Sequence, residues 1–118
     1  MARKVNVLGT KYTIIDGVSS EKLGEGVAGF CDPFKKEILI LDFWKHPEWK
    51  LEETEKLATM KREVMRHEIV HAFLNESGLK ECAAGATSSW AQNEEMVDWF
   101  AIQGPKIYTA WKEAGCDA

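Results

Sequence analysis

The stretch Met65-Arg66-His67-Glu68-Ile69-Val70-His71-Ala72-Phe73 carries two of the three histidines of this 118-residue chain, in the pattern His-Glu-x-x-His. The stretch has the residue pattern of a helix. Residues four positions apart lie one turn above one another on a helix, so His67 and His71 can direct both imidazoles at one ion. Glu68 would project from the neighbouring face. Two neutral nitrogen ligands, an open coordination position and a nearby carboxylate are what metal-assisted hydrolysis requires. The motif therefore predicts two ligands and a general base, and leaves a third ligand to be found.

The residues around the motif predict one long helix over residues 51–76. Glutamates at its start favour the positive end of the helix dipole, and Gly78 is a plausible left-handed cap after its end. Paired histidines on an apolar face can also be core residues, but the carboxylate within the motif favours metal binding. The buried stripe predicted by the three-four spacing consists of Leu57, Met60, Val64, His67, His71 and Leu74.

Two hairpins are predicted ahead of this helix. Residues 5–8 and 12–15 flank Gly9-Thr10-Lys11, and residues 27–31 and 37–42 flank a turn signal at 32–36. Residues 38–41 are apolar on both faces, as expected for a strand covered by a helix. We therefore expect a small, mainly antiparallel sheet of three or four strands. If one edge borders the metal site, an extended peptide could pair with it, and the Gly29 side of the second hairpin is the candidate edge.

The third ligand is expected on a later helix. After a loop over residues 79–89, residues 92–103 predict a helix that ends at Gly104-Pro105, and residues 105–114 predict a last helix. Glu94 and Asp98 share one face of the first of these helices. Glu94 is the expected ligand and Glu95 its alternative, while Asp98 could accept the free N–H of a ligand histidine. The competing interpretation is an acidic helix start that faces water.

Three other residues could belong to a site. His46 precedes a proline and is expected at the surface or as a cap rather than as a ligand. Tyr12 and Tyr108 are conceivable oxyanion donors, although a tyrosine in a small core more often packs with its hydroxyl at the surface.

Composition places the chain among ordinary globular proteins. Its 118 residues predict one domain over 1–118, and the apolar runs are too short for a transmembrane helix. No apolar signal-peptide region follows the N-terminus, so a cytoplasmic location is expected. Three widely spaced cysteines, Cys31, Cys82 and Cys116, argue against a disulfide framework and against a thiolate zinc site. The net charge of −4, with scattered basic residues, argues against nucleic-acid binding.

The two motifs together resemble those of the zincin metallopeptidases. The combination of residues 67–71 with 93–98 is similar to the gluzincin arrangement, in which His-Glu-x-x-His is followed by Asn-Glu-x-x-x-Asp on a later helix. The resemblance implies that Glu94 is the third zinc ligand and that Asp98 orients a ligand histidine. The short interval is also similar to that of the ImmA/IrrE group and of small metallopeptidases encoded by phages and prophages, where Asp98 would replace a usual Asn. The long C-terminal half of larger gluzincins has no counterpart here.

These observations predict an α+β, zincin-like domain, with a small antiparallel sheet packed on a long active-site helix and two C-terminal helices. The expected activity is hydrolysis of peptide bonds in a narrow protein or peptide substrate, without a nucleic-acid or membrane partner. Zn²⁺ would be held by His67, His71 and Glu94, with Glu68 as general base. Imidazole and carboxylate ligands also accept manganese, iron or cobalt. The alternative is a catalytically inactive, zinc-stabilised protein-interaction module.

Overall fold

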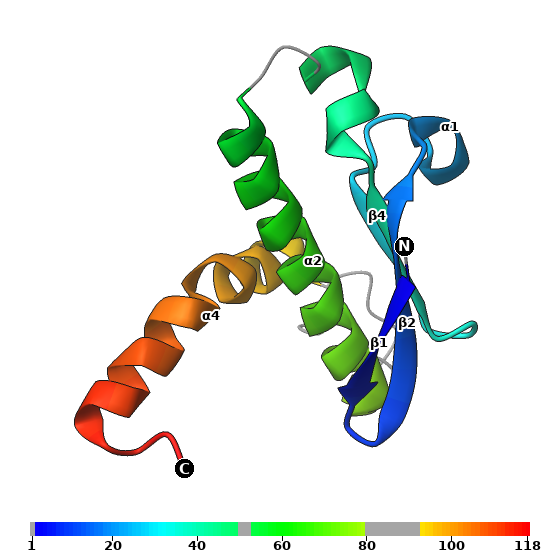
Figure 1. Cartoon of the computed structure of the whole chain (residues 1–118). Coiled ribbons are helices and arrows are strands. Elements are labelled where there is room, and N and C mark those ends of the chain that lie inside the picture. The colour runs from blue at the N-terminus through cyan, green and yellow to red at the C-terminus, as the bar shows by residue number, and fades with distance from the viewer. Residues whose placement is uncertain (1, 50–52, 80–92) are drawn as a thin grey trace.

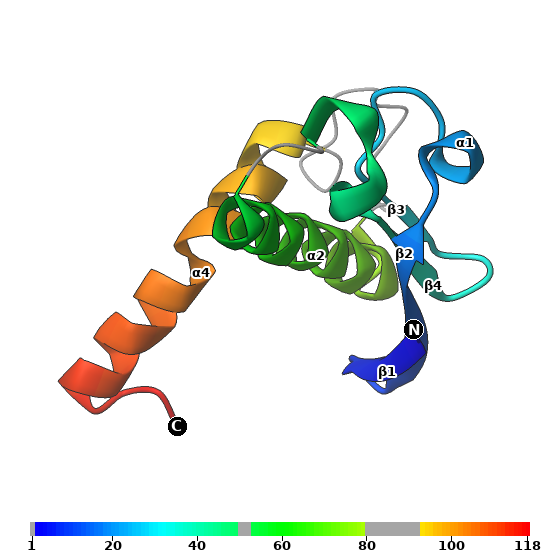
Figure 2. The same ribbon diagram turned by 45° about the horizontal axis from the view of Figure 1, so that its top comes forward.

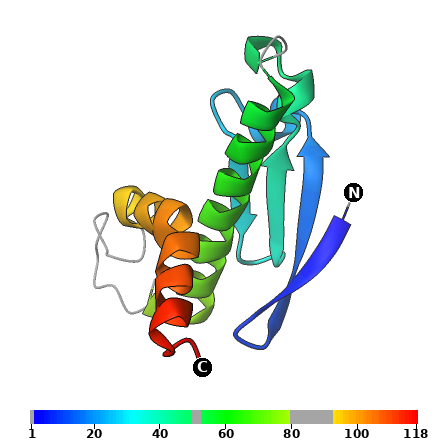
Figure 3. The same ribbon diagram turned by 60° about the vertical axis from the view of Figure 1, so that its left-hand side comes forward.

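The computed structural model describes residues 2–49, 53–79 and 93–118 (Figure 1). A four-stranded sheet lies along one side of a long helix, α2, and a second long helix, α4, crosses α2 away from the sheet (Figure 3). The α+β class predicted from the sequence is confirmed. In chain order the elements are β1 (Ala2–Val7), β2 (Thr10–Val18), α1 (Ser20–Leu23), β3 (Gly29–Asp32), β4 (Glu37–Leu41), two short 3-10 helices (Phe43–Lys45 and Pro47–Trp49), α2 (Thr54–Glu76) and α4 (Glu94–Ala114).

Both expected hairpins are present, and each has a local cause. Strands β1 and β2 pair through a tight turn at Leu8 and Gly9, whose φ angles of 51° and 91° suit the twist of a two-residue hairpin. In the β3–β4 turn, Asp32 Oδ1 accepts hydrogen bonds from the backbone N–H groups of Phe34 and Lys35, both at 3.0 Å. This Asp side chain closes the turn and fixes the register of β3 against β4.

The predicted small sheet has four strands and two antiparallel pairings, but its third pairing is parallel, so the sheet is mixed and the expectation of antiparallel pairing is confirmed only in part. The strand order is β1-β2-β4-β3, and β2 runs parallel to β4 with Ile14 opposite Ile38. Residues 19–28, which include α1, connect β2 to β3 (Figure 2). This connection is long enough for β3 to lie at the edge of the sheet, so that β4 occupies the position next to β2. The hydrophobic pattern of β4 predicts a central strand, but it does not determine which neighbour lies on either side.

The core lies between the sheet and α2. Tyr12, Ile38, Ile40, Phe43 and Leu57 are each at most 1% exposed. Burying a large apolar side chain contributes about 1.5–3 kcal/mol, so this layer holds α2 against the sheet.

The buried face of α2 is rotated from the predicted stripe. Its most buried side chains are Leu57, Glu68 and Ala72, whereas His67 and His71 are half-buried at the margin. The histidines therefore border the core and are not part of it. Glu68, which follows His67 directly, is on the buried face of the helix.

The C-terminal region forms one helix, so the prediction of two helices divided at Gly104-Pro105 was wrong. Proline has no N–H to donate to the carbonyl four residues earlier, which here is that of Ala101. The Nε of Arg66 on α2 donates to that carbonyl instead. The helix continues through Pro105 because a neighbouring helix supplies the missing donor. Its C-terminal half extends away from the rest of the molecule (Figures 1 and 2).

The C-terminal end of α2 is tied to the sheet by Glu76. Its carboxylate accepts hydrogen bonds from Tyr12 Oη at 2.8 Å, Lys36 Nζ at 2.6 Å and Thr10 Oγ1 at 3.3 Å. The Lys36 and Tyr12 hydrogen bonds hold the pKa of Glu76 below its usual value. We call these four residues the Glu76 cluster. The cluster lies about one helical turn beyond His71, since each residue adds about 1.5 Å of rise. At that point it fixes how α2 is rotated about its own axis.

Some predictions fall outside the described residues. These are the start of the first long helix at 51–52, residue 92 of the next helix, Cys82, and all of the expected loop except Leu79. In the part of the chain that the structure covers, none of the helices has the length and hydropathy needed to cross a bilayer.

Candidate metal centre

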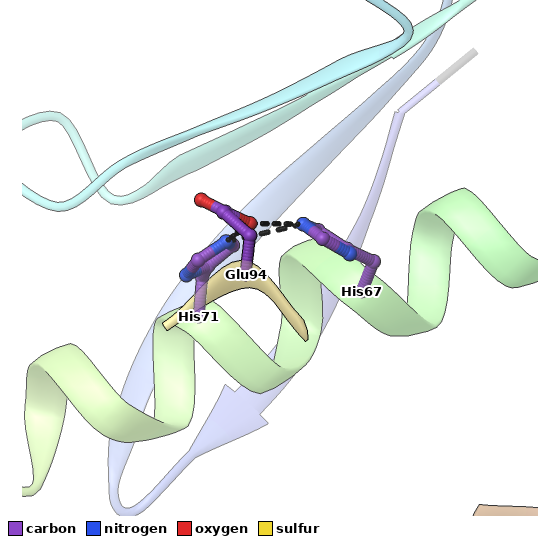
Figure 4. Close-up of side chains that lie close together, drawn as sticks. All are labelled: His67, His71 and Glu94. Atoms are coloured by element: carbon purple, nitrogen blue, oxygen red, sulfur yellow. Dashed lines mark hydrogen bonds and ion pairs between the residues drawn. The ribbon is translucent and has the colours of Figure 1, made fainter. Parts of the chain in front are cut away.

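Three side chains from two helices converge on one point (Figure 4). His67 and His71 project from the same face of α2, and Glu94 reaches them from the first turn of α4. Glu94 Oε1 lies 2.9 Å from His67 Nε2 and 3.0 Å from His71 Nε2, and the two Nε2 atoms are 3.1 Å apart. Two nitrogens and one oxygen thus form a nearly equilateral triangle.

The position of Glu94 follows from how α4 begins. Asn93 caps the helix, with its side chain accepting the Met96 backbone N–H at 2.8 Å, so Glu94 is the first residue of the helix. Val97 and Ala101, three and seven positions later, are buried. Since Glu94, Val97 and Ala101 share one face, packing this face onto α2 brings the Glu94 carboxylate to the histidines.

Asp98 lies where it can orient His67. Its Oδ1 is 2.6 Å from His67 Nδ1, the ring nitrogen on the side away from Glu94. If Nδ1 carries the proton and donates it to Asp98, Nε2 is left with a lone pair directed at the triangle. The carboxylate would thus select the tautomer that can bind a metal.

Glu68 is buried beside the triangle without a polar partner. Its residue surface is only 7% exposed, and within the described part of the chain no hydrogen bond or ion pair reaches its carboxylate. Burial raises the pKa of Glu68 to about 7, the nearby His67 lowers it, and the charges of Glu94 and Asp98 raise it. A buried carboxylate without a partner is uncommon and marks a candidate functional residue.

The residues present fit a bound metal ion. Two imidazole nitrogens and one carboxylate oxygen are the donor set of many zinc sites, and the three ligand atoms lie within 4.8 Å of one another. Tetrahedral zinc separates its ligand atoms by about 3.3 Å, slightly more than the separations here. A bound cation would also place positive charge beside the unpartnered Glu68 carboxylate.

The triangle opens onto a cavity of about 810 Å³. One wall is formed by His67, Glu68 and His71 of α2, with Glu94 and Asp98 of α4 beside them, and the opposite wall by the segment leading into β3 together with β3 itself. Strand β3 is the last strand of the described sheet on this side. The strand edge at Gly29, which the sequence predicts to border the metal site, therefore lies against the cavity.

Other candidates from the sequence lie elsewhere. His46 ends the first 3-10 helix and packs against Trp49, with ring centroids 4.7 Å apart. Tyr12 belongs to the Glu76 cluster, and the half-exposed Tyr108 is not among the described residues that line the cavity. Glu95 is exposed and does not line the cavity.

Two residues that matter to the site carried no recognisable signal. Arg66 adjoins the motif, but nothing in its sequence context points to the carbonyl of Ala101. The sequence marks Gly29 only as part of a strand edge, and its contact with Glu68 depends on how closely β3 approaches α2. Comparison of the chain with protein-family models, with curated proteins and with solved structures found no match.

Proposed function

We propose that this chain is a zinc-dependent metallopeptidase of zincin type, in which His67, His71 and Glu94 hold the metal. The observation that carries the proposal is the position of Glu68, a buried carboxylate to which no other described residue donates a hydrogen bond, next to a cluster of ligand type in an open cavity. A structural zinc site is almost always closed by four protein ligands and needs no such carboxylate.

The residues of the chain divide the chemistry between them. A bound zinc ion would lower the pKa of a coordinated water and polarise the scissile carbonyl. Glu68 accepts the proton of the attacking water and then delivers it to the leaving amine. Burial raises the pKa of Glu68, and a bound cation beside it would lower that pKa again, so with metal present the carboxylate would be ionised near neutral pH and able to accept a proton. Asp98 keeps His67 in the tautomer that binds metal.

The substrate is proposed to be an extended segment of a protein or peptide, drawn from a narrow set. Leu41 N–H donates to Ala28 C=O, so in the antiparallel ladder the next residue, Gly29, directs its backbone polar groups away from β4. An extended chain could pair with this edge and present its carbonyl to the metal site.

The metal is tested first, by elemental analysis of protein purified without added metal. We expect about one zinc per chain, with the zinc lost in His71→Ala and Glu94→Ala. Glu95→Ala is the matched control, because it removes a neighbouring carboxylate that does not line the cavity. Failure of the wild-type chain to take up zinc would refute the metal site.

The chemistry is tested with Glu68→Gln. A proton shuttle contributes about 10²–10⁴ in rate, so this variant should lose most peptidase activity and keep its zinc. Because the substrate is proposed to be narrow, activity is sought with a proteome-derived peptide library as well as with casein. A zinc-loaded wild type that cleaves none of these, and behaves as the variant does, would instead indicate an interaction module.

A further inference from the structure

The closest approach between the sheet and α2 in the cavity occurs at Gly29. A Cβ atom built on Gly29 would lie 2.8 Å from Val64 Cγ1 and 3.0 Å from both Cγ and Oε2 of Glu68. These separations are shorter than ordinary van der Waals contact, which is about 3.5–4.0 Å between carbons. The hydrogen of glycine is therefore the only side chain that fits between β3 and the Glu68 carboxylate in this arrangement.

Steric contact is what positions Glu68. Within the described residues no hydrogen bond or ion pair holds its carboxylate, so packing alone decides where the side chain lies. Gly29 approaches Glu68 from the sheet, and Val64, one turn earlier on α2, borders the same space. Val64 packs on the core and is stiff at χ1 because it is β-branched and helical. The long, unbranched Glu68 side chain is thus the group that would move if Gly29 had a side chain.

We propose that Gly29 is a positioning residue for the peptidase reaction, because its missing side chain leaves the space in which the Glu68 carboxylate is held beside the metal ligands. The inference rests on the proposed function. Gly29 does not have a positive φ, so its role is not conformational and alanine is compatible with its backbone. Its role is to keep the distance between β3 and α2 short enough to bury Glu68 without displacing it.

The test is Gly29→Ala, with Gly104→Ala as matched control. An added Cβ on Gly104 meets no atom within 4 Å outside its own helix backbone, and this position also lacks a positive φ. We expect Gly29→Ala to bind zinc as the wild type does, because no metal ligand is touched. Its kcat should fall at least tenfold, toward that of Glu68→Gln, while KM changes less than about threefold. Gly104→Ala should match the wild type in zinc content, kcat and KM.

A second variant separates positioning of Glu68 from general packing. Val64→Ala removes Val64 Cγ1, the atom nearest to a Cβ added at Gly29. The double variant Gly29→Ala/Val64→Ala should therefore be thermally more stable than Gly29→Ala alone, while the contact between the added Cβ and Glu68 persists. We expect kcat to stay low in this double variant. Recovery of kcat together with stability, relative to Val64→Ala alone, would overturn the proposal, because Gly29 would then act only through packing.

Crystal structures of the zinc-loaded wild type, Gly29→Ala and Gly104→Ala provide a readout that needs no substrate. The Glu68 carboxylate should be displaced in Gly29→Ala only, with the ligand positions unchanged. An undisplaced carboxylate would refute the positioning role even if the protein is an active peptidase. If the carboxylate is displaced in Gly29→Ala but the zinc-loaded wild type has no peptidase activity, the steric role is upheld and the proposed function is refuted.

Discussion

Arg66 of α2 donates its Nε hydrogen to the carbonyl of Ala101, the one α4 carbonyl that Pro105 leaves without a helical donor. Arg66 precedes the first histidine of the motif, and Ala101 lies two turns after Glu94. The contact therefore joins the helix that carries two candidate ligands to the helix that carries the third. It explains both why α4 does not break at the proline and why Glu94 is held near the histidines.

This relationship predicts a measurable coupling between Arg66 and Pro105. Arg66→Ala should lower the free energy of unfolding by about 1–3 kcal/mol, the cost of a part-buried carbonyl left without a donor. Pro105→Ala returns an N–H to the helix, so in that background Arg66→Ala should cost much less. Urea unfolding of the two single variants and the double variant measures the coupling. Equal costs in both backgrounds would mean that Arg66 does not replace the missing donor.

Asp98 is predicted to act on zinc affinity through His67. Partners of ligand histidines typically contribute about 10–100-fold to metal affinity, so Asp98→Ala should weaken zinc binding by roughly this factor. Asp98→Asn should weaken it less, because the amide oxygen still accepts from Nδ1. Competition with a chromophoric chelator gives the dissociation constants, and Glu95→Ala is the control. Unchanged affinity in Asp98→Ala would remove Asp98 from the site.

Removal of the metal should destabilise the fold. Zinc at a hundred times its dissociation constant adds about 2.7 kcal/mol, which raises Tm by roughly 10 °C for a chain of this size. The shift measured between zinc-loaded and chelator-treated protein should disappear in His71→Ala. A zinc-dependent shift of the same size in that variant would place the bound ion elsewhere.

The Glu76 cluster predicts acid-sensitive stability. The pKa of Glu76 is lowered in the folded chain, so its contribution is present above its ordinary value of 4.5 and is lost as pH falls through the folded-state value. Glu76→Gln should therefore be less stable than the wild type near neutral pH, and the difference should shrink below about pH 4. Urea unfolding across this range measures it. A difference that does not change with pH would show that the charge of Glu76 contributes nothing.

The parts of the molecule that were predictable depend on local patterns. The motif histidines lie four apart on one helix, and Glu94 and Asp98 lie four apart on another, so each pair is set by helical geometry alone. The meeting of the two pairs could be predicted only from the hypothesis of a metal site, which needs a third ligand near the first two. The hairpins were predictable for the same reason, since each is specified by a few turn residues.

The parts that were not predictable depend on contacts between distant residues. The proline pattern at 104–105 usually ends a helix, and only the Arg66 side chain, 35 residues away from Ala101, reverses that outcome. The parallel pairing of β2 with β4 depends on the path of the connection between β2 and β3. The burial of Glu68 depends on the distance between β3 and α2, which no local pattern encodes.

The strand order leaves the described sheet with two edges that differ in their exposure to other chains. Strand β1 forms one edge, and Arg3, Lys4 and Asn6 are exposed along it. Charged side chains on an edge strand disfavour pairing with a second molecule, so this edge is protected against aggregation. The other edge, β3, is only four residues long and carries exposed Phe30. A strand this short offers few backbone groups for self-association. The β3 edge can therefore accept a peptide without also causing copies of the chain to polymerise along it.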